Sequence, residues 1–293
     1  MKKALPFLYT FICVFMITTL PAQDITKEKL LKIVRQKSSL IKTLGFDYTV
    51  FGLPYKNYDD DLTTNGLTKH FIHKYKGEKS YVSELNDKGK VIHIMSYDGE
   101  KSYLLTPKRY EDSLTIQTGM ANEIISLYSP KSFFDCIECC APIEEILQRE
   151  NTIVRKDNDK ILIEWDDHYI FQKRGLVVRK DHYIASGKVW IDPKLNYAIV
   201  KMDDYVNKIP ASKSEISEFK LMKVDGCDIH FPMKIITKRY DFFKDGRHIY
   251  SNEYNVLKVD INKNYPDRIF KQTGGLFVKK WDRSTNTGVM GKK

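Results

Sequence analysis

The sequence is poor in the residues that mark several protein classes. It has five Cys, 15 Gly and 10 Pro among 293 residues, too few for a collagen-like or low-complexity chain. After its first residues no apolar run approaches the ~20 residues that a membrane span requires. Hydrophobic residues make up 42% and charged residues 29%, an ordinary globular balance that excludes a disordered chain.

Recognisable catalytic motifs are also absent. There is no Gly-x-Ser-x-Gly, no His-Glu-x-x-His and no phosphate-binding loop. His70 and His73 are three apart in a predicted strand, so they point to opposite faces and make a poor metal pair. We expect no enzyme, no metal and no cofactor. A hydrolase remains the catalytic alternative, with Trp165-Asp166-Asp167-His168 as the place where an acid and a His could converge.

The first residues read as a secretory signal. Lys2 and Lys3 precede an uncharged, mostly apolar stretch over residues 4–20, and Pro21-Ala22-Gln23 leads into a charged run. We predict a signal peptide over residues 1–22, cut after Ala22 or, as the alternative, after Gln23. An uncleaved anchor helix stays open. Lipidation at Cys13 is rejected, because the apolar stretch continues well beyond it. The mature protein is expected to be exported, to the periplasm or beyond, and soluble.

Export makes disulfides plausible for the cysteines that remain after cleavage. These are Cys136, Cys139, Cys140 and Cys227. We expect Cys227 to bond one of the other three, because the adjacent Cys139 and Cys140 are poorly placed to bond each other. The connectivity stays open, as do a thiolate metal site and free thiols.

The net charge of +10 does not indicate a nucleic-acid binding surface. Five Lys or Arg against one Asp lie in the last segment, residues 272–293, so the body of the chain is only mildly basic. We expect no nucleic acid partner and peripheral contact with anionic lipid at most.

Hydrophobic spacing predicts one helix followed by many strands. Apolar residues three and four apart over 25–44 indicate an amphipathic helix, capped by Asp24 or Thr26 and ended by Gly45. A period of two and short turns then predict a meander of antiparallel strands. Its strands are Tyr48–Leu53, Leu67–Lys76, Lys79–Leu85, Val91–Asp98 and Lys101–Thr106.

An insertion over residues 118–148 separates this meander from a second run of strands. Thr118–Tyr128 and Ile143–Gln148 read as short helices around Phe133 and Phe134, and we predict a lid that lies on an apolar surface. The later strands show clear alternation. They are Thr152–Arg155, Ile161–Trp165, His168–Phe171, Leu176–Ile184, Lys188–Asp192, Tyr197–Val206, Ile216–Val224, Ile229–Phe242 and Ile249–Ile261.

No long linker divides the strands, so residues 24–271 form one predicted domain, followed by a basic and at most partly ordered tail over 272–293. A large twisted antiparallel sheet curls. The predicted class is α+β, mainly β: an incomplete antiparallel β-barrel, a curled sheet of about 11 strands. Its N-terminal helix and short helices cover the concave face.

Four segments in this order resemble the LolA-like superfamily of periplasmic lipoprotein carriers, outer-membrane receptors and sensor-type relatives. They are the hairpin Tyr97–Leu105, the turn Val189–Tyr197, Val224-Asp225-Gly226 with Phe231-Pro232, and the closing segment Val256–Phe270. The resemblance implies a half-barrel with helices over its mouth and an apolar cavity for acyl chains. The segment 70–76 departs from the carriers, because it lacks the Arg and Pro of their functional strand.

We therefore expect an exported protein that holds the acyl chains of lipid or lipoprotein noncovalently in an apolar concavity. The expected roles are outer-membrane lipoprotein sorting or envelope lipid handling, and the expected state is a monomer. The alternative is an envelope protein-interaction or sensor module with a filled core and a protein partner. The predicted lining consists of Phe71, Ile94, Ile124, Phe133, Phe134, Trp190, Met202, Phe231, Met233 and Ile235.

Overall fold

The fold comes from a computed structural model of the whole chain. The structure describes residues 25–52, 54–56, 62–64, 68–106, 113–118, 134, 142–167, 185–242, 245–272, 277–282 and 287–292. The predicted signal peptide, the helix Thr118–Tyr128 and the strands His168–Phe171 and Leu176–Ile184 lie outside these residues. None of the helices in the described part is long and apolar enough to cross a membrane.

Helix α1 (Lys27–Ser39) begins where the sequence predicts. The side chain of Thr26 accepts a hydrogen bond from the backbone N–H of Lys29, which caps the first turn. The predicted end at Gly45 is wrong, because the helix stops at Ser39 and Gly45 lies inside strand β1. The ring of Tyr265 packs so closely over Gly45 that a Cβ there would overlap its hydroxyl. This glycine therefore marks a close approach rather than a helix end.

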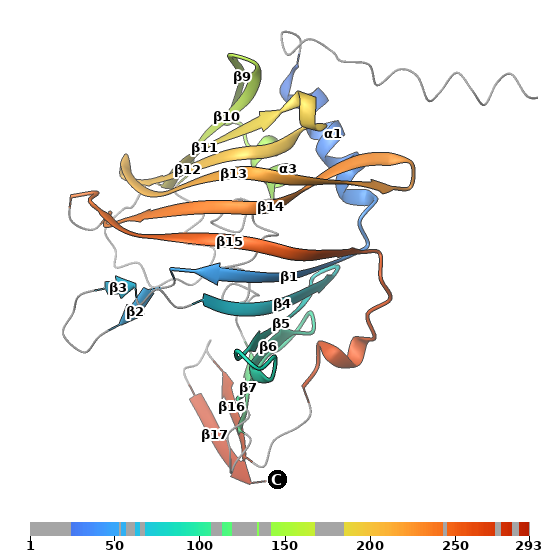
Figure 1. The fold of residues 1–293 in the computed structure, drawn as a ribbon, viewed down its shortest axis with the longest axis vertical. Coiled ribbons are helices and arrows are strands. Elements are labelled where there is room, and N and C mark those ends of the chain that lie inside the picture. Colours follow the sequence, from blue (N-terminus) through green and yellow to red (C-terminus); the bar gives the residue numbers. More distant parts are fainter. Residues whose placement is uncertain are drawn as a thin grey trace, which may run out of the picture.

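One large sheet dominates the fold (Figure 1). Its 15 strands lie in the order β17-β16-β8-β7-β6-β5-β4-β1-β15-β14-β13-β12-β11-β10-β9. In chain order they are β1 (Thr43–Phe51), β4 (Thr68–Lys76), β5 (Lys79–Leu85), β6 (Val91–Tyr97), β7 (Ser102–Thr106), β8 (Ser113–Thr118), β9 (Ile153–Asp157), β10 (Lys160–Asp167), β11 (Ala185–Asp192), β12 (Ala198–Val206), β13 (Ile209–Val224), β14 (Cys227–Tyr240), β15 (His248–Ile261), β16 (Phe277–Asp282) and β17 (Thr287–Lys292).

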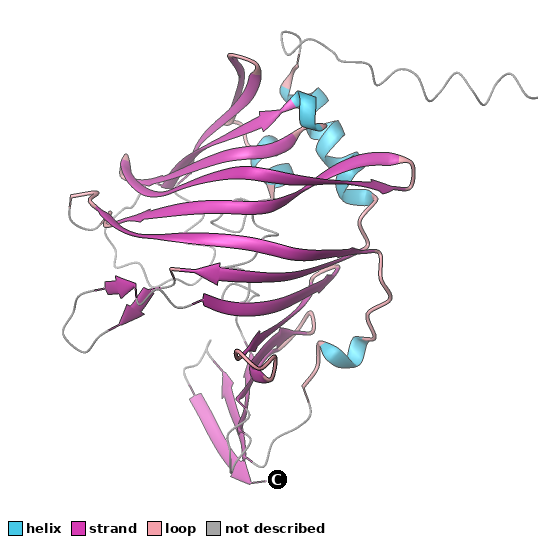
Figure 2. Cartoon of the chain, viewed as in Figure 1, coloured by secondary structure: helices cyan, strands magenta, loops and turns pink. Residues whose placement is uncertain are grey.

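Smaller elements complete the described fold. The strands β2 (Pro54–Lys56) and β3 (Leu62–Thr64) pair as a separate ribbon. Helix α3 (Ile143–Gln148) matches the second predicted helix of the insertion, and 3₁₀ turns occupy Pro193–Leu195 and Asp267–Ile269. Figure 2 shows how few helices accompany the strands, with α1 and α3 beside the β10–β14 part of the sheet.

The mainly β, open and curled sheet agrees with the predicted class, because β9 and β17 end the sheet without closing it. The strand count exceeds the prediction. β8 occupies residues that the sequence left unassigned, and β16 and β17 lie in the tail. β16 pairs with β8 in parallel, while the other neighbours in this sheet are antiparallel. The C-terminal segment thus extends the sheet at the β8 end.

The sheet has two faces, defined here by β14. The inner face carries Phe231, Ile235 and Thr237, which are fully buried, and the outer face carries Ile236 and Lys238, which are exposed. Leu30 of α1 and three residues of α3 belong to the same hydrophobic cluster as the inner face. Arg35 Nε donates to Glu144 Oε1 at 2.8 Å and ties α1 to α3.

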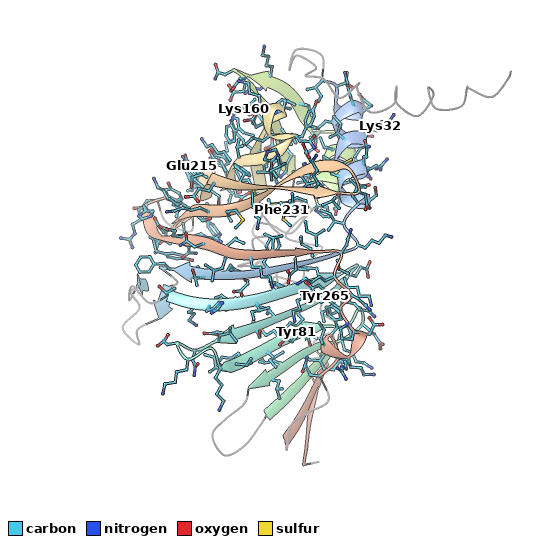
Figure 3. All side chains as sticks on the ribbon, turned by 45° about the vertical axis from the view of Figure 1, so that its right-hand side comes forward. Lys32, Tyr81, Lys160, Glu215, Phe231 and Tyr265 are labelled. Atoms are coloured by element: carbon cyan, nitrogen blue, oxygen red, sulfur yellow. The ribbon has the colours of Figure 1, made fainter. Side chains whose placement is uncertain are left out.

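Residues 262–272 form a strap on the outer face of the first half of the sheet. The ammonium of Lys74 lies 5.4 Å from the ring centroid of Tyr81 and 5.5 Å from that of Tyr265 (Figure 3 labels both tyrosines). Lys74 alternates with the buried His73, so it lies on the face opposite the inner face. Phe270 is fully buried. The inner face is contacted instead by α1, α3 and Phe134, which pack against its hydrophobic cluster.

Candidate functional site on the inner face of the sheet

An apolar row crosses the middle of the inner face. Ile235 pairs in register with Ile216 on one side and with Tyr254 on the other, and Tyr254 pairs with Val50. Directly paired residues share a face. All four side chains are buried, Val50 and Ile235 completely. The row is a continuous hydrocarbon wall that runs from β13 to β1.

Phe134 of the insertion lies flat on this wall. Its ring stacks on the ring of Phe231 with 4.7 Å between centroids and 11° between planes (Figure 3 labels Phe231). Phe231 has no exposed surface, and Phe134 is half-buried against the same core. The structure thus brings together one predicted lid residue and one predicted sheet residue. The other two predicted lid residues, Ile124 and Phe133, lie outside the described residues.

Four further predicted lining residues also lie on the inner face. Phe71 stacks on Tyr48 at 5.6 Å between centroids, and Met202 is buried beside Val189, its partner in β11. Ile235 belongs to the apolar row, and Met233 packs half-buried against the same core. The period-two pattern of β14 predicts that Phe231, Met233 and Ile235 share a face, and the structure places them on one face of the sheet.

Trp190 does not belong to this wall. It alternates with the buried Val189 and Ile191, so its ring lies on the outer face. Its indole Nε1 donates to Asp157 Oδ2 at 2.6 Å, and the ammonium of Lys201 lies 4.4 Å from the ring centroid. An indole has a polar N–H to satisfy, and the outer face supplies a carboxylate and a cation for it.

Ile94 is likewise on the outer face. It pairs with Ser83, while its neighbour Met95 pairs with Val82 and packs against the core. Val82 in turn pairs with His73, which is fully buried on the inner face. The sequence prediction chose the wrong member of an apolar pair, because Ile94 and Met95 are adjacent and alternation alone does not decide between them.

Polar side chains replace the apolar row one step along the strands. Ser214 pairs with Thr237, and Thr237 pairs with Asn252, all on the inner face and all buried. The hydroxyls of Ser214 and Thr237 are 2.9 Å apart and satisfy each other. Asn252 has no exposed surface, and neither atom of its carboxamide has a hydrogen-bond partner among the residues that the structure describes. We call Ser214, Thr237 and Asn252 the polar row.

A second row of polar residues lies beyond the polar row, toward the ends of the strands. Ser212 Oγ donates to Asp204 Oδ2 at 2.8 Å, and both residues are buried. Arg239 stands opposite Ser212 in the register and is half-buried. The inner face therefore changes from hydrocarbon at Ile235, to uncharged polar groups at the polar row, to charged groups at Asp204 and Arg239.

The phenol of Tyr48 is buried on the inner face. Burial raises the pKa of Tyr48 well above its ordinary value of 10.0, and the nearby phenols of Tyr75 and Tyr254 raise it further. Tyr75 Oη lies 3.2 Å from Nδ1 of His73, and the two rings stack. The phenol of Tyr48 can therefore exchange a hydrogen bond with a ligand without introducing charge.

The acid–base and metal candidates of the sequence lie apart from the inner-face row. The described part of the chain contains no group of three or more His, Cys, Asp or Glu side chains that could hold a metal ion. His70 Nε2 lies 2.5 Å from Asp47 Oδ1, on the face opposite His73. Asp166 is exposed at the end of β10, and His168 lies outside the described residues.

The predicted disulfide to Cys227 is not present. Cys227 is a free, half-buried thiol where β14 begins, at the tip of the hairpin that β13 and β14 form. It pairs with Val224 across the tight turn at Asp225-Gly226. Cys136, Cys139 and Cys140 lie outside the described residues. The even number of cysteines suggested a disulfide, but Cys227 at the hairpin tip has no disulfide partner among the described side chains.

Comparisons with known proteins leave the family open. No family model matches the chain. No curated protein matches it either. Among solved structures, a crystal structure of a DUF1329 family protein from Desulfovibrio piger is similar, with a TM-score of 0.49 and 10% sequence identity. The similarity covers 86% of this chain and 98% of that chain. We infer function from the residues of this chain alone.

Proposed function

We propose that the protein is an exported lipid-binding protein of the LolA-like kind. It holds the acyl chains of a lipid or lipoprotein noncovalently between the inner face of the sheet and the insertion. The observation that supports the proposal is the flat contact of Phe134 on Phe231, which puts an aromatic ring of the insertion on a hydrocarbon wall. An acyl chain enters by taking the place of the Phe134 ring.

The wall has the length that an acyl chain needs. Six residues separate Phe231 from Thr237 along β14, which at ~3.3 Å per residue spans about 20 Å. The acyl chains of one leaflet fill half of a hydrocarbon core of about 30 Å, or about 15 Å. A chain laid along β14 therefore reaches from Phe231 past Ile235 to the polar row.

The energy of such binding is sufficient for a reversible complex. Each buried CH₂ contributes about 0.8 kcal/mol, so ten of them contribute about 8 kcal/mol before the cost of association. A micromolar dissociation constant corresponds to about 8 kcal/mol. Because association itself costs at least about 4 kcal/mol, a micromolar complex requires about fifteen buried CH₂ groups, and an acyl chain of about that length or longer is the expected ligand.

A fluorescent fatty acid tests this proposal. The mature chain is titrated with 11-(dansylamino)undecanoic acid, whose emission rises in an apolar site. We expect Phe134→Asp to weaken binding at least tenfold, because a carboxylate against Phe231 opposes an acyl chain there. The matched control is Phe51→Asp, on the outer face, where the native ring is 47% exposed; this variant should bind as the wild type does.

Two outcomes would overturn the proposal. One is a wild-type protein that binds no probe. The other is a Phe134→Asp variant with wild-type circular dichroism and undiminished affinity, since the cover would then play no part in binding.

A protein-interaction module is the second candidate. It is favoured by large apolar side chains on the exposed surface, namely Leu257 at 59%, Leu221 at 51% and Ile236 at 38% exposure. This candidate expects no probe binding by the wild type. It also expects that Leu257→Lys reduces chemical cross-linking to a protein partner in the native envelope, whereas Phe134→Asp leaves the cross-linking unchanged.

A further inference from the structure

The most unusual group on the inner face is the side chain of Asn252. Its carboxamide is completely buried, and neither its nitrogen nor its oxygen has a hydrogen-bond partner among the described residues. Leaving a buried polar group unpaired is costly, and such groups are rare in folded proteins. An uncompensated carboxamide in a wall of a proposed binding site indicates a group that is satisfied only when the ligand is bound.

We propose that Asn252 anchors an uncharged amide of the bound amphiphile, and so selects amide-bearing lipids over ester-linked ones. The inference rests on the proposed function and adds the chemical class of the ligand's polar end. Asn252 stands beside Thr237, two residue pairs along from the apolar row at Ile235 and Tyr254, which is the next position on the same face. An acyl chain on that row therefore brings its first polar group to Asn252.

The neighbours of Asn252 favour an uncharged partner. Thr237 and Ser214 satisfy each other at 2.9 Å, so they form a neutral side wall and do not compete for the ligand. Asp204 is buried one step farther along, where Ser212 Oγ donates to it, so it lies outside the polar row. The half-buried Arg239 lies in that next row and not in the polar row itself.

The chemistry of the carboxamide selects an amide. Asn252 presents N–H donors and a carbonyl acceptor on one planar group. A ligand amide that presents N–H and C=O side by side closes two hydrogen bonds with it. An ester presents acceptors only, so it can satisfy Nδ2 but leaves Oδ1 unpaired. A site built to pair both atoms discriminates against a ligand that lacks the donor.

Two simple probes of equal chain length test this selection. Dodecanamide and methyl dodecanoate compete for the wild-type protein against the dansylated fatty acid. We expect dodecanamide to bind at least tenfold more tightly than the ester. In Asn252→Leu, whose side chain has a similar shape, the two probes should bind within twofold of each other.

The matched control lies on the same strand. Asn255 is half-buried, and its Nδ2 already donates to Glu253 Oε1 at 3.1 Å. Asn255→Leu should therefore keep the wild-type preference for the amide. Binding of the dansylated probe by both variants shows that they are folded.

Each contrary result has one meaning. Equal affinity of the wild type for amide and ester, or a preference that survives in Asn252→Leu, overturns the role of Asn252 and leaves the proposed function standing. A wild type that binds neither the dansylated probe nor the two competitors overturns the proposed function and this inference with it.

Discussion

Replacing Asn252 by Leu is expected to stabilise the ligand-free protein. The carboxamide is fully buried, and both of its polar atoms lack partners among the described residues. Burying an unpaired polar group costs about 1–3 kcal/mol. Leu has a similar shape and adds no cavity, and the neighbouring hydroxyls of Thr237 and Ser214 keep their mutual hydrogen bond. The expected gain in the free energy of unfolding is therefore about 1–3 kcal/mol.

The gain is measured by urea unfolding of the delipidated mature chain, followed by circular dichroism. For a chain of this size 1 kcal/mol corresponds to a shift of about 2–4 °C in Tm, so Asn252→Leu should melt several degrees higher. Thr237→Val is the matched control with the opposite sign. It removes a satisfied hydrogen bond from the same row and should lose about 1 kcal/mol.

A loss of stability in Asn252→Leu would refute this reasoning. It would mean that the carboxamide makes hydrogen bonds in the free protein and that Asn252 has a structural role. The combination of higher stability and lost amide selection is what distinguishes a ligand anchor from a core residue.

Two further substitutions test the energetics of the β9–β12 half. Glu164 Oε2 accepts a hydrogen bond from Arg155 Nε, which lowers the pKa of Glu164 below its ordinary value of 4.5. The ionised form of Glu164 therefore contributes stability above pH 4.5, and this contribution is lost as the pH falls through the lowered pKa. Glu164→Gln should cost up to about 1 kcal/mol near neutral pH, and the difference should vanish in urea titrations near pH 3; a difference that persists there would contradict the assignment. Gly187→Ala places a Cβ against the Trp165 ring and should cost about 1–3 kcal/mol. Combining it with Trp165→Leu should cost less than the two single changes together, and strict additivity would show that the ring does not lie on Gly187.

Alternation in β14 made part of the site predictable. Ile229, Phe231, Met233 and Ile235 fall on one face in the sequence, and the structure buries them or packs them against the core on one face. The cover over that face was predictable from Phe134, because an apolar ring between strands needs an apolar surface. The contact of Phe134 with Phe231 joins two segments about a hundred residues apart, and no local pattern specifies such a pairing.

The errors have physical causes. Trp190 was assigned to the wall for its apolar area, but its N–H and a nearby cation hold it on the outer face. Gly45 was taken as a helix end, but a close packing contact with Tyr265 requires a glycine within a strand. Strands β16 and β17 were missed because pairing, of β16 with β8 and of β17 with β16, forms them rather than hydrophobic alternation.

Asn252 was missed although a signal was present. In the sequence it alternates with Tyr254 and Val256, two residues of the inner face, and period two places it on that face. An Asn at an inward position of a strand is a local inconsistency of the kind that functional sites carry. Treating polar residues at inward strand positions as candidate site residues, and not as exceptions to the alternation, would have identified Asn252.

Native mass spectrometry of the mature protein, purified from its own envelope, tests the central claim most directly. The account predicts an excess mass of one acyl-bearing amphiphile per chain, which organic extraction releases and which contains an amide. An apo mass, together with no uptake of added dodecanamide or dansylated fatty acid, would contradict the claim that the inner face holds acyl chains.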